Sequence, residues 1–218
     1  MAQIHVSDIT AEDILSFWFP ATLPALDRDD HIAFWQSRMQ GGMDAAITEH
    51  YADLTRAGAQ GLLDGWAETA RGRLALILVL DQFPRSLWRG TPAAYAQDIK
   101  ATRLAIAGIG NGHFDALDCP WQKTFYLIAM SHCEGPEHLE RMDRIIALAD
   151  REVASMTGPT AELYADMGEQ PRRVREIIGR FGRHPHRNAI YGRVSSPDEA
   201  AYIARGVFPH EREIGEDS

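Results

Sequence analysis

The sequence predicts a single-domain protein built almost entirely of α-helices. Apolar residues recur every third or fourth position along most of the 218-residue chain, which is the spacing of one helix face. No stretch of about four residues or more alternates strictly between apolar and polar side chains with the β-branched enrichment typical of strands. About ten helices with short connections indicate antiparallel pairs stacked in layers, or a short superhelix.

The first helices are marked by capping residues and by glycine. Thr10 and Asp13 resemble a capping box, and the helix that they begin should end at Phe17–Phe19, just before a proline. The next apolar face runs from Ile32 to Leu54. Because glycine disfavours helix, we expect the pair Gly41-Gly42 to bend or split this second helix.

The middle helices are bounded by prolines. A short helix around residues 62–66 leads into an apolar helix over residues 74–83, where Pro84 should end it because a residue before proline disfavours helical geometry. Thr91-Pro92 has the residue types of an N-cap and a first helical position. The pattern therefore predicts a new helix that continues through Ile106.

The second half repeats this organisation up to an acidic tail. A glycine-rich break, GIGNGH, separates it from the first half, and the triad Ser196, Pro197 and Glu199 is typical of a helix start. We expect one domain over residues 1–206 and a frayed tail over residues 207–218. The helices expected in this half are 121–130, 137–156, 160–167, 171–181 and one that begins after Ser196.

Composition and charge restrict the class of protein. The amino terminus lacks the basic and apolar stretches of a secretory leader, and no apolar run approaches the length of a membrane span. Two cysteines, Cys119 and Cys133, therefore predict reduced thiols in a cytoplasmic protein. The formal net charge of −9 argues against nucleic-acid binding, because such a chain repels phosphate backbones.

A first group of candidate site residues lies at the end of the apolar helix. Asp81 closes this helix, and an ionised carboxylate in apolar surroundings needs a partner. Gln82 follows it, and Arg85 or Arg89 could supply the opposite charge. The simpler interpretation is a structural ion pair that fixes a helix corner.

A second group lies in the segment GRFGRHPHRNAIYGR, which is rich in hydrogen-bond donors. His184 precedes a proline and should be extended, so we expect His184 and His186 to point to one side and the neighbouring arginines to the other. Seven arginines between residues 172 and 193 suit a carboxylate or phosphate ligand. In this segment, the ligand-binding candidates are Arg180, Arg183 and Arg187, together with His184 and Asn188.

A third pair, His132 and Glu134, lies at the end of another helix. Combined with His184 and His186, it would make a metal site of histidines and a carboxylate. However, the sequence has none of the motifs whose spacing fixes a metal site, so we expect neither a metal nor another cofactor.

These motifs resemble those of a known family. LALILVLDQFPRSLWRGTP (Leu74–Pro92) and RFGRHPHRNAIYGR (Arg180–Arg193) are similar to segments of the bacterial "domain of unknown function 924" family, and the similarity extends over nearly the whole chain. The resemblance implies a tetratricopeptide-like helical superhelix and no established activity. Val174 stands where the family commonly has a histidine and His184 where it has a phenylalanine, so we expect no role that needs the former histidine.

The resemblance also implies which polar positions matter, and a superhelix could bring them together on its concave face. They are Asp81, Gln82, Arg85, His132, Glu134, Arg180, Arg183, His186, Arg187 and Asn188.

Four hypotheses follow for the function. In the first, Arg183, Arg187 and Arg85 bind an anionic small molecule or peptide carboxylate, with His186 and Asn188 orienting it. In the second, His186 or His132 is the general base of a hydrolase-type enzyme, with or without a metal ion, and Glu134 or Asp81 orients it. In the third, the groove binds a partner protein, and in the fourth the polar network only specifies packing.

Overall fold

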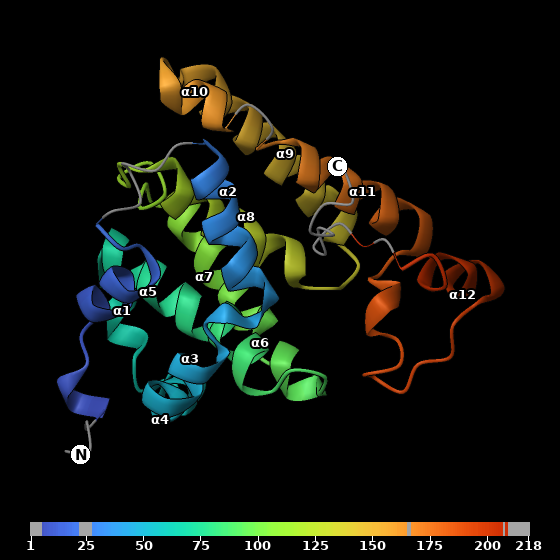
Figure 1. Ribbon diagram of the computed structural model, residues 1–218, viewed down its shortest axis with the longest axis horizontal. Helices are drawn as coiled ribbons and strands as arrows, with labels where there is room; N and C mark the ends of the chain where they lie inside the picture. Colours follow the sequence, from blue (N-terminus) through green and yellow to red (C-terminus); the bar gives the residue numbers. More distant parts are fainter. Residues whose placement is uncertain (1–5, 22–27, 165–166, 207, 209–218) are drawn as a thin grey trace.

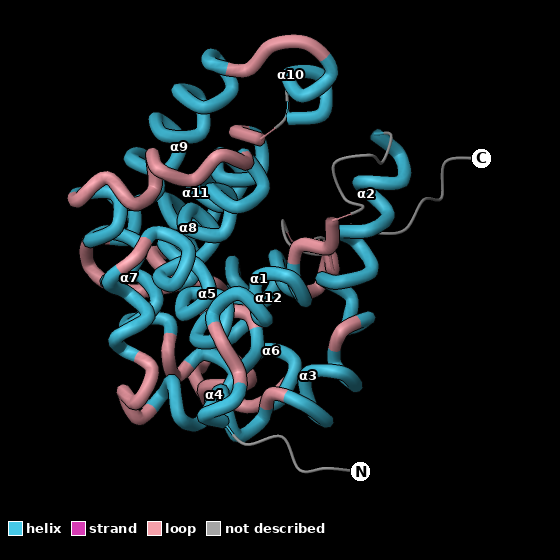
Figure 2. The backbone as a smooth tube through the Cα atoms, turned by 90° about the vertical axis from the view of Figure 1, so that its left-hand side faces the viewer, coloured by secondary structure: helices cyan, strands magenta, loops and turns pink. Residues whose placement is uncertain are grey.

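A computed structural model describes residues 6–21, 28–164, 167–206 and 208. Within these ranges the chain forms helices, turns and loops and no strand (Figure 2), which confirms the all-α prediction. None of the described helices has both the length and the apolar content that are required to cross a membrane. Apart from Phe208, the acidic tail expected over 207–218 lies outside the described residues.

The α-helices in chain order are α1 (Ala11–Trp18), α2 (Arg28–Ser37), α3 (Asp44–His50), α4 (Ala52–Ala59), α5 (Ala70–Asp81), α6 (Phe83–Leu87), α7 (Asp98–Gly110), α8 (Pro120–His132), α9 (His138–Ser155), α10 (Pro159–Tyr164), α11 (Glu169–Phe181) and α12 (Pro197–Ile203). Shorter elements connect them. The 3-10 turns are η1 (Val6–Asp8), η4 (Asp64–Glu68), η5 (Pro92–Tyr95) and η6 (Pro185–Arg187), and η3 (Arg38–Gly42) is a π turn.

Helix α5 is the centre of the fold. It is buried continuously from Gly72 to Asp81, and the apolar side chains over 74–80 are completely inaccessible to solvent. Helices α1, α4, α6, α7 and α8 all pack against it. Because each buried aliphatic side chain contributes about 1.5–3 kcal/mol, this helix makes a large contribution to stability.

From α5 outward, the longer helices pack on one another in sequence order. Helix α1 packs on α5, α5 on α7, α7 on α8, α8 on α9 and α9 on α11. Figure 1 shows α9 and α11 side by side on the outer edge of this stack. The layered arrangement agrees with the stacked pairs that the sequence indicates, and the superhelical twist stays a prediction.

The helix boundaries agree with the sequence where side-chain caps set them. Thr10 with Asp13 and Ser196 with Glu199 both form complete capping boxes. The helix expected over 32–54 is split at the glycine pair, as predicted, and it is divided a second time where no break was expected. It is broken at η3, where Gly41 has a φ of 95°, and again at Tyr51, whose backbone is not helical (φ −124°, ψ 6°).

The helix expected from Thr91 is also different in the structure. The Thr91 side chain accepts no capping hydrogen bond from η5, and Pro92 begins only this 3-10 turn. Helix α7 starts at Asp98 and continues beyond Ile106 to Gly110. The glycine-rich segment is therefore partly helical.

Gly108 permits the closest approach in the stack. A Cβ atom at this position would lie 2.6 Å from both Arg73 Cδ and Tyr126 Cε1. Both neighbours are buried, and Arg73 donates hydrogen bonds to the carbonyl oxygens of Ala67 and Leu104, so neither can move freely.

We therefore expect Gly108→Ala to lower the free energy of unfolding by about 1–3 kcal/mol, as overpacked cores do. Gly110→Ala is the matched control, because nothing lies within 4 Å of a Cβ there. It should be neutral or stabilising by up to about 1 kcal/mol. Urea denaturation of both variants measures the difference, and equal stabilities would contradict the close-packing interpretation.

Candidate functional site

The candidate site begins where two packed helices end. Asp81 is the last residue of α5, and His132 is the last residue of α8. His132 Nδ1 lies 2.8 Å from Asp81 Oδ1 and 3.1 Å from Oδ2, while Gln82 donates a second hydrogen bond to Oδ2 at 2.5 Å. The Asp81 side chain is only 1% exposed, whereas that of His132 is 20% exposed. The imidazole therefore lies between a buried carboxylate and the surface.

A chain of arginines and carboxylates extends from this pair. Arg85 donates to the Asp81 carbonyl oxygen, and it donates to Asp98 Oδ1 at 2.8 Å. Asp98 also accepts from Arg187 at 3.1 Å, and Arg187 donates to the His132 carbonyl oxygen at 2.8 Å. These contacts join the ends of α5, α6, α7 and α8 to η6. We call Asp81, Arg85, Asp98, His132 and Arg187 the central network.

Two tyrosines cover this network. The Cζ atom of Arg187 lies 4.3 Å from the centre of the Tyr95 ring, and that of Arg85 lies 5.4 Å from it. The Tyr191 ring lies 5.7 Å from the Tyr95 ring and is partly exposed. Both arginines are thus held by charge on one side and by an aromatic face on the other.

Glu134 holds the arginine-rich loop. Its carboxylate accepts from Arg193 at 2.5 Å and from the His184 backbone N–H at 2.8 Å. Arg193 also donates to the His184 carbonyl oxygen at 3.3 Å. Because Glu134 is engaged with this loop, Asp81 is the carboxylate that orients His132.

Two further histidines are buried beside the network. His138 Nε2 and His184 Nε2 lie 2.8 Å and 3.2 Å from the carbonyl oxygen of Ser131. Burial lowers the pKa of His138 to about 4, and burial together with Arg187 lowers the pKa of His184 well below its usual value. Both rings are therefore neutral at pH 7.

The electrostatics fix the protonation state of the Asp81–His132 pair. Burial alone would raise the pKa of Asp81, but Arg85 and His132 beside it lower that pKa to about 2. Burial and Arg85 lower the pKa of His132 below its usual 6.5, against the opposing effect of Asp81. An ionised carboxylate can only accept, so the neutral imidazole carries its proton on Nδ1. Among the described residues, Nε2 has no hydrogen-bond partner.

Arg183 and Arg180 lie outside the central network. Arg183 donates to both carboxylate oxygens of Glu199, at 2.7 Å and 2.9 Å, at the start of α12. Arg180 forms an exposed ion pair of 3.7 Å with Asp198. Both arginines therefore connect the end of α11 to α12.

The expected alternation along the histidine loop is wrong for Arg187, whereas the two histidine rings lie close together as expected. His184 is extended, but residues 185–187 form the 3-10 turn η6, which places Arg187 in the core instead of opposite the histidines. The His186 ring lies 5.3 Å from the His184 ring and 5.4 Å from the Phe208 ring. Asn188 is buried and donates to Ser195 Oγ at 3.0 Å.

Sequence reasoning missed Asp98, which bridges Arg85 and Arg187. A signal for it exists, because Asp98 occupies the inward face of α7. It precedes the buried residues Ala101, Thr102, Ala105 and Gly108 at helical spacing. An acid at an inward position of an apolar face needs a cationic partner. Spacing alone does not identify which arginine supplies it.

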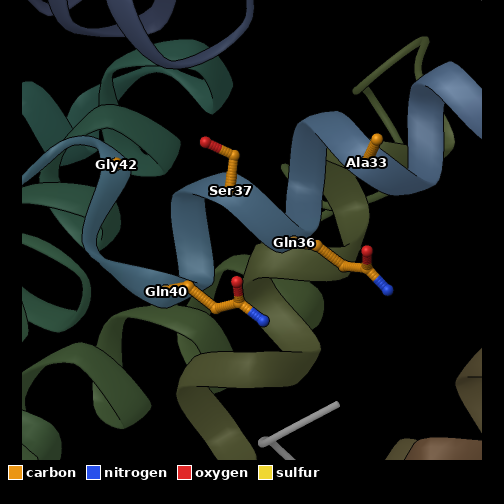
Figure 3. A pocket seen from close by; sticks show the side chains of 5 residues that line it. All are labelled: Ala33, Gln36, Ser37, Gln40 and Gly42. Carbon is orange, nitrogen blue, oxygen red and sulfur yellow. The ribbon is translucent and has the colours of Figure 1, made fainter. Parts of the chain in front are cut away.

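Neither of two surface hollows is lined by the central network. One, of about 470 Å³, lies along α2 and η3 and is lined by Ala33, Gln36, Ser37, Gln40 and Gly42 (Figure 3). The other, of about 410 Å³, lies at the start of α8 beside the ion pair of Lys123 and Glu152. Among the described residues, no three His, Cys, Asp or Glu side chains are arranged to hold a metal ion.

Comparisons with known proteins give a family and a structural neighbour. Residues 14–207 match a family described as a bacterial protein of unknown function, DUF924. A solved structure of a protein of unknown function, ATU0120 from Agrobacterium tumefaciens, is 33% identical and superimposes with a TM-score of 0.69. The match covers 90% of this chain and 97% of that one. No functionally curated protein matches the sequence.

The buried histidines make stability depend on pH. Since the folded-state pKa of His138 is about 4 and its unfolded value is about 6.5, the unfolded state binds more protons between these limits. The free energy of unfolding should therefore fall as the pH is lowered from 6.5 to 4, by about 3 kcal/mol for this residue.

Urea denaturation between pH 7 and pH 4 measures how steeply the free energy of unfolding changes with pH. His138→Gln, which keeps a donor for the Ser131 carbonyl and cannot be protonated, should flatten this dependence. His50→Gln, at an exposed histidine, should leave it unchanged. An identical slope in His138→Gln and the wild type would contradict the prediction.

Proposed function

This chain belongs to the bacterial protein family of unknown function DUF924, and we propose that it is a hydrolase-type enzyme whose general base is His132, oriented by Asp81. The observation that carries the proposal is the 2.8 Å contact of His132 Nδ1 with a buried carboxylate, which leaves Nε2 without a partner among the described residues. A general base needs this arrangement, in which one ring nitrogen is fixed and the other can accept a proton.

The protonation state supports this assignment. A base must be unprotonated before it acts, and burial with Arg85 keeps the pKa of His132 below 6.5. The imidazole is therefore neutral at pH 7. When Nε2 takes a proton, the ionised Asp81 stabilises the resulting imidazolium.

In the proposed reaction, Nε2 takes a proton from water as the water oxygen attacks an acyl carbon. The imidazolium then returns this proton to the leaving oxygen or nitrogen as its bond to the acyl carbon breaks.

The rest of the central network serves as support. Asp98 holds Arg85 and Arg187 together, and Arg187 fixes the end of α8 through the His132 carbonyl oxygen. Asp98 and Arg187 thus help to determine where the Asp81–His132 pair lies, and neither contacts the substrate in this proposal. Positioning of this kind affects rate strongly, since small displacements of a catalytic group reduce activity.

An anion site built from Arg85, Arg183 and Arg187 has less support. Each of these arginines already donates to a carboxylate, and the Arg187 side chain is only 4% exposed. An added anion would have to compete with an internal carboxylate. The geometry therefore favours acid–base chemistry at His132 over anion binding by these three residues.

The test is a screen of activated esters and amides, followed by comparison of variants. His132→Gln should lower kcat/KM by about 10²- to 10⁴-fold, as the removal of a general base does. Asp81→Asn should lower it as well, because the orienting charge is lost. In the wild type, kcat/KM should rise with pH through a pKa below 6.5 and level off near neutrality.

Thermal denaturation of each variant shows whether the loss comes from chemistry or from unfolding. His50→Gln is the control for removing an exposed histidine. Turnover that is unchanged in His132→Gln, or a panel without turnover by the folded wild type, would overturn the proposal.

A further inference from the structure

Arg38 is a partly buried cation without an opposite charge. In the described part of the chain it makes no hydrogen bond or ion pair, and its Nε is fully buried without a partner. The other described arginines that are buried or partly buried all donate to carboxylates, carbonyl oxygens or a histidine ring. They are Arg73, Arg85, Arg141, Arg175, Arg183, Arg187 and Arg193.

Aromatic rings take the place of that missing partner. The Cζ atom of Arg38 lies 3.6 Å from the centre of the Phe34 ring and 5.9 Å from that of Trp35. Burial lowers the pKa of Arg38 to about 10, so the guanidinium is still charged at neutral pH. A ring face attracts a cation but does not accept its N–H groups as an oxygen does. Unlike Nε, the two terminal nitrogens are not fully buried, and they have no hydrogen-bond partner among the described residues.

Arg38 lies on the face of its helix segment that packs on α8. His31, Trp35 and Arg38 recur at helical spacing on one face of the segment formed by α2 and η3. On this face, the His31 ring lies 6.0 Å from Trp121 and the Trp35 ring lies 5.4 Å from Phe125, both on α8. Figure 1 shows α2 running across α8.

The hollow of Figure 3 lies on the other side of this helix. It is lined by Ala33, Gln36, Ser37 and Gln40, which recur on the opposite face from Trp35 and Arg38. Arg38 therefore lies on a different face of this segment, the face that packs on α8 through His31 and Trp35.

Arg38 lies at an irregular point of the backbone, where the helix is interrupted. Arg38 begins the π turn η3, which Gly41 closes with a φ of 95°. A Cβ atom at Gly42 would lie 2.7 Å from the Ser37 carbonyl oxygen, so the turn requires glycine there as well. A π turn interrupts the regular path of a helix and is frequent at functional sites.

We propose that Arg38 is an anion-binding residue, whose terminal nitrogens bind the carboxylate or phosphate group of a small ligand between α2 and α8. The physical reason is that a desolvated charge needs a partner, and within the described residues the protein supplies none. The planar guanidinium offers paired donors that match two oxygens of such a group. An apolar ligand body would pack against Phe34 and Trp35.

Removal of the Arg38 charge should not destabilise the protein. In the absence of ligand, Arg38→Met should leave the melting temperature unchanged or raise it, because an unpaired charge is replaced by an apolar side chain of similar length. A melting temperature lowered by several degrees would overturn the proposal, because it would mean that an internal partner already holds the guanidinium.

Binding is tested with inorganic phosphate, acetate and benzoate by calorimetry and thermal shift. At least one of them should bind the wild type and bind Arg38→Met at least about tenfold more weakly. Arg144→Met, at an exposed arginine, is the matched control and should bind like the wild type. Preference for phosphate would identify a phosphate ligand, and preference for benzoate over acetate would identify a carboxylate with an apolar body.

Two results would contradict an anion site at Arg38. They are the absence of binding by all three anions and equal binding by the wild type and Arg38→Met. The outcome is independent of the proposed base, because His132→Gln should keep full affinity for the anion while it loses turnover.

Discussion

The buried carboxylate of Asp81 is the constraint on which the central part of the structure depends. A desolvated charge at the end of the most apolar helix is tolerated only if it is neutralised and hydrogen-bonded. His132, Gln82 and Arg85 meet this requirement, and Arg85 is in turn fixed by Asp98. One buried charge therefore determines where α6, α7 and α8 meet α5. Each of these helices supplies a polar side chain to this junction: Arg85 from α6, Asp98 from α7 and His132 from α8.

Much of the fold could be predicted from the sequence because helical periodicity and caps are local signals. Thr10 and Ser196 set helix starts through side chains only three residues away. The break at Tyr51 has no such signal, since neither glycine nor proline stands there. Thr91-Pro92 has the right residue types, but the hydroxyl caps nothing and a 3-10 turn results. Local chemistry thus permits a helix start without imposing it.

The site was harder to predict because its partners are distant in sequence. The need of Asp81 for a cation could be predicted, since an acid ends an apolar run and Arg85 follows within one turn. Its contact with His132 spans 51 residues, and that of Asp98 with Arg187 spans 89. Spacing cannot choose among many arginines at such separations. The sequence therefore indicated the candidate residues more reliably than their roles, and Glu134 and Arg187 prove to hold the loop and the helix end.

The pairing of buried arginines with carboxylates restricts which polar groups can bind a ligand or act on a substrate. Arg85, Arg187 and Arg193 face Asp81, Asp98 and Glu134, so these groups neutralise one another. An anionic ligand gains little binding energy from arginines that already have partners. It would have to displace a carboxylate of the protein that carries the same charge. Among the described residues, His132 Nε2 and the Arg38 guanidinium are polar groups outside this balance. His132 shares its face of α8 with Trp121 and Phe125, the residues that contact the Arg38 face of α2. The proposed base and the face of α2 that carries Arg38 therefore both adjoin the aromatic side chains on one face of α8.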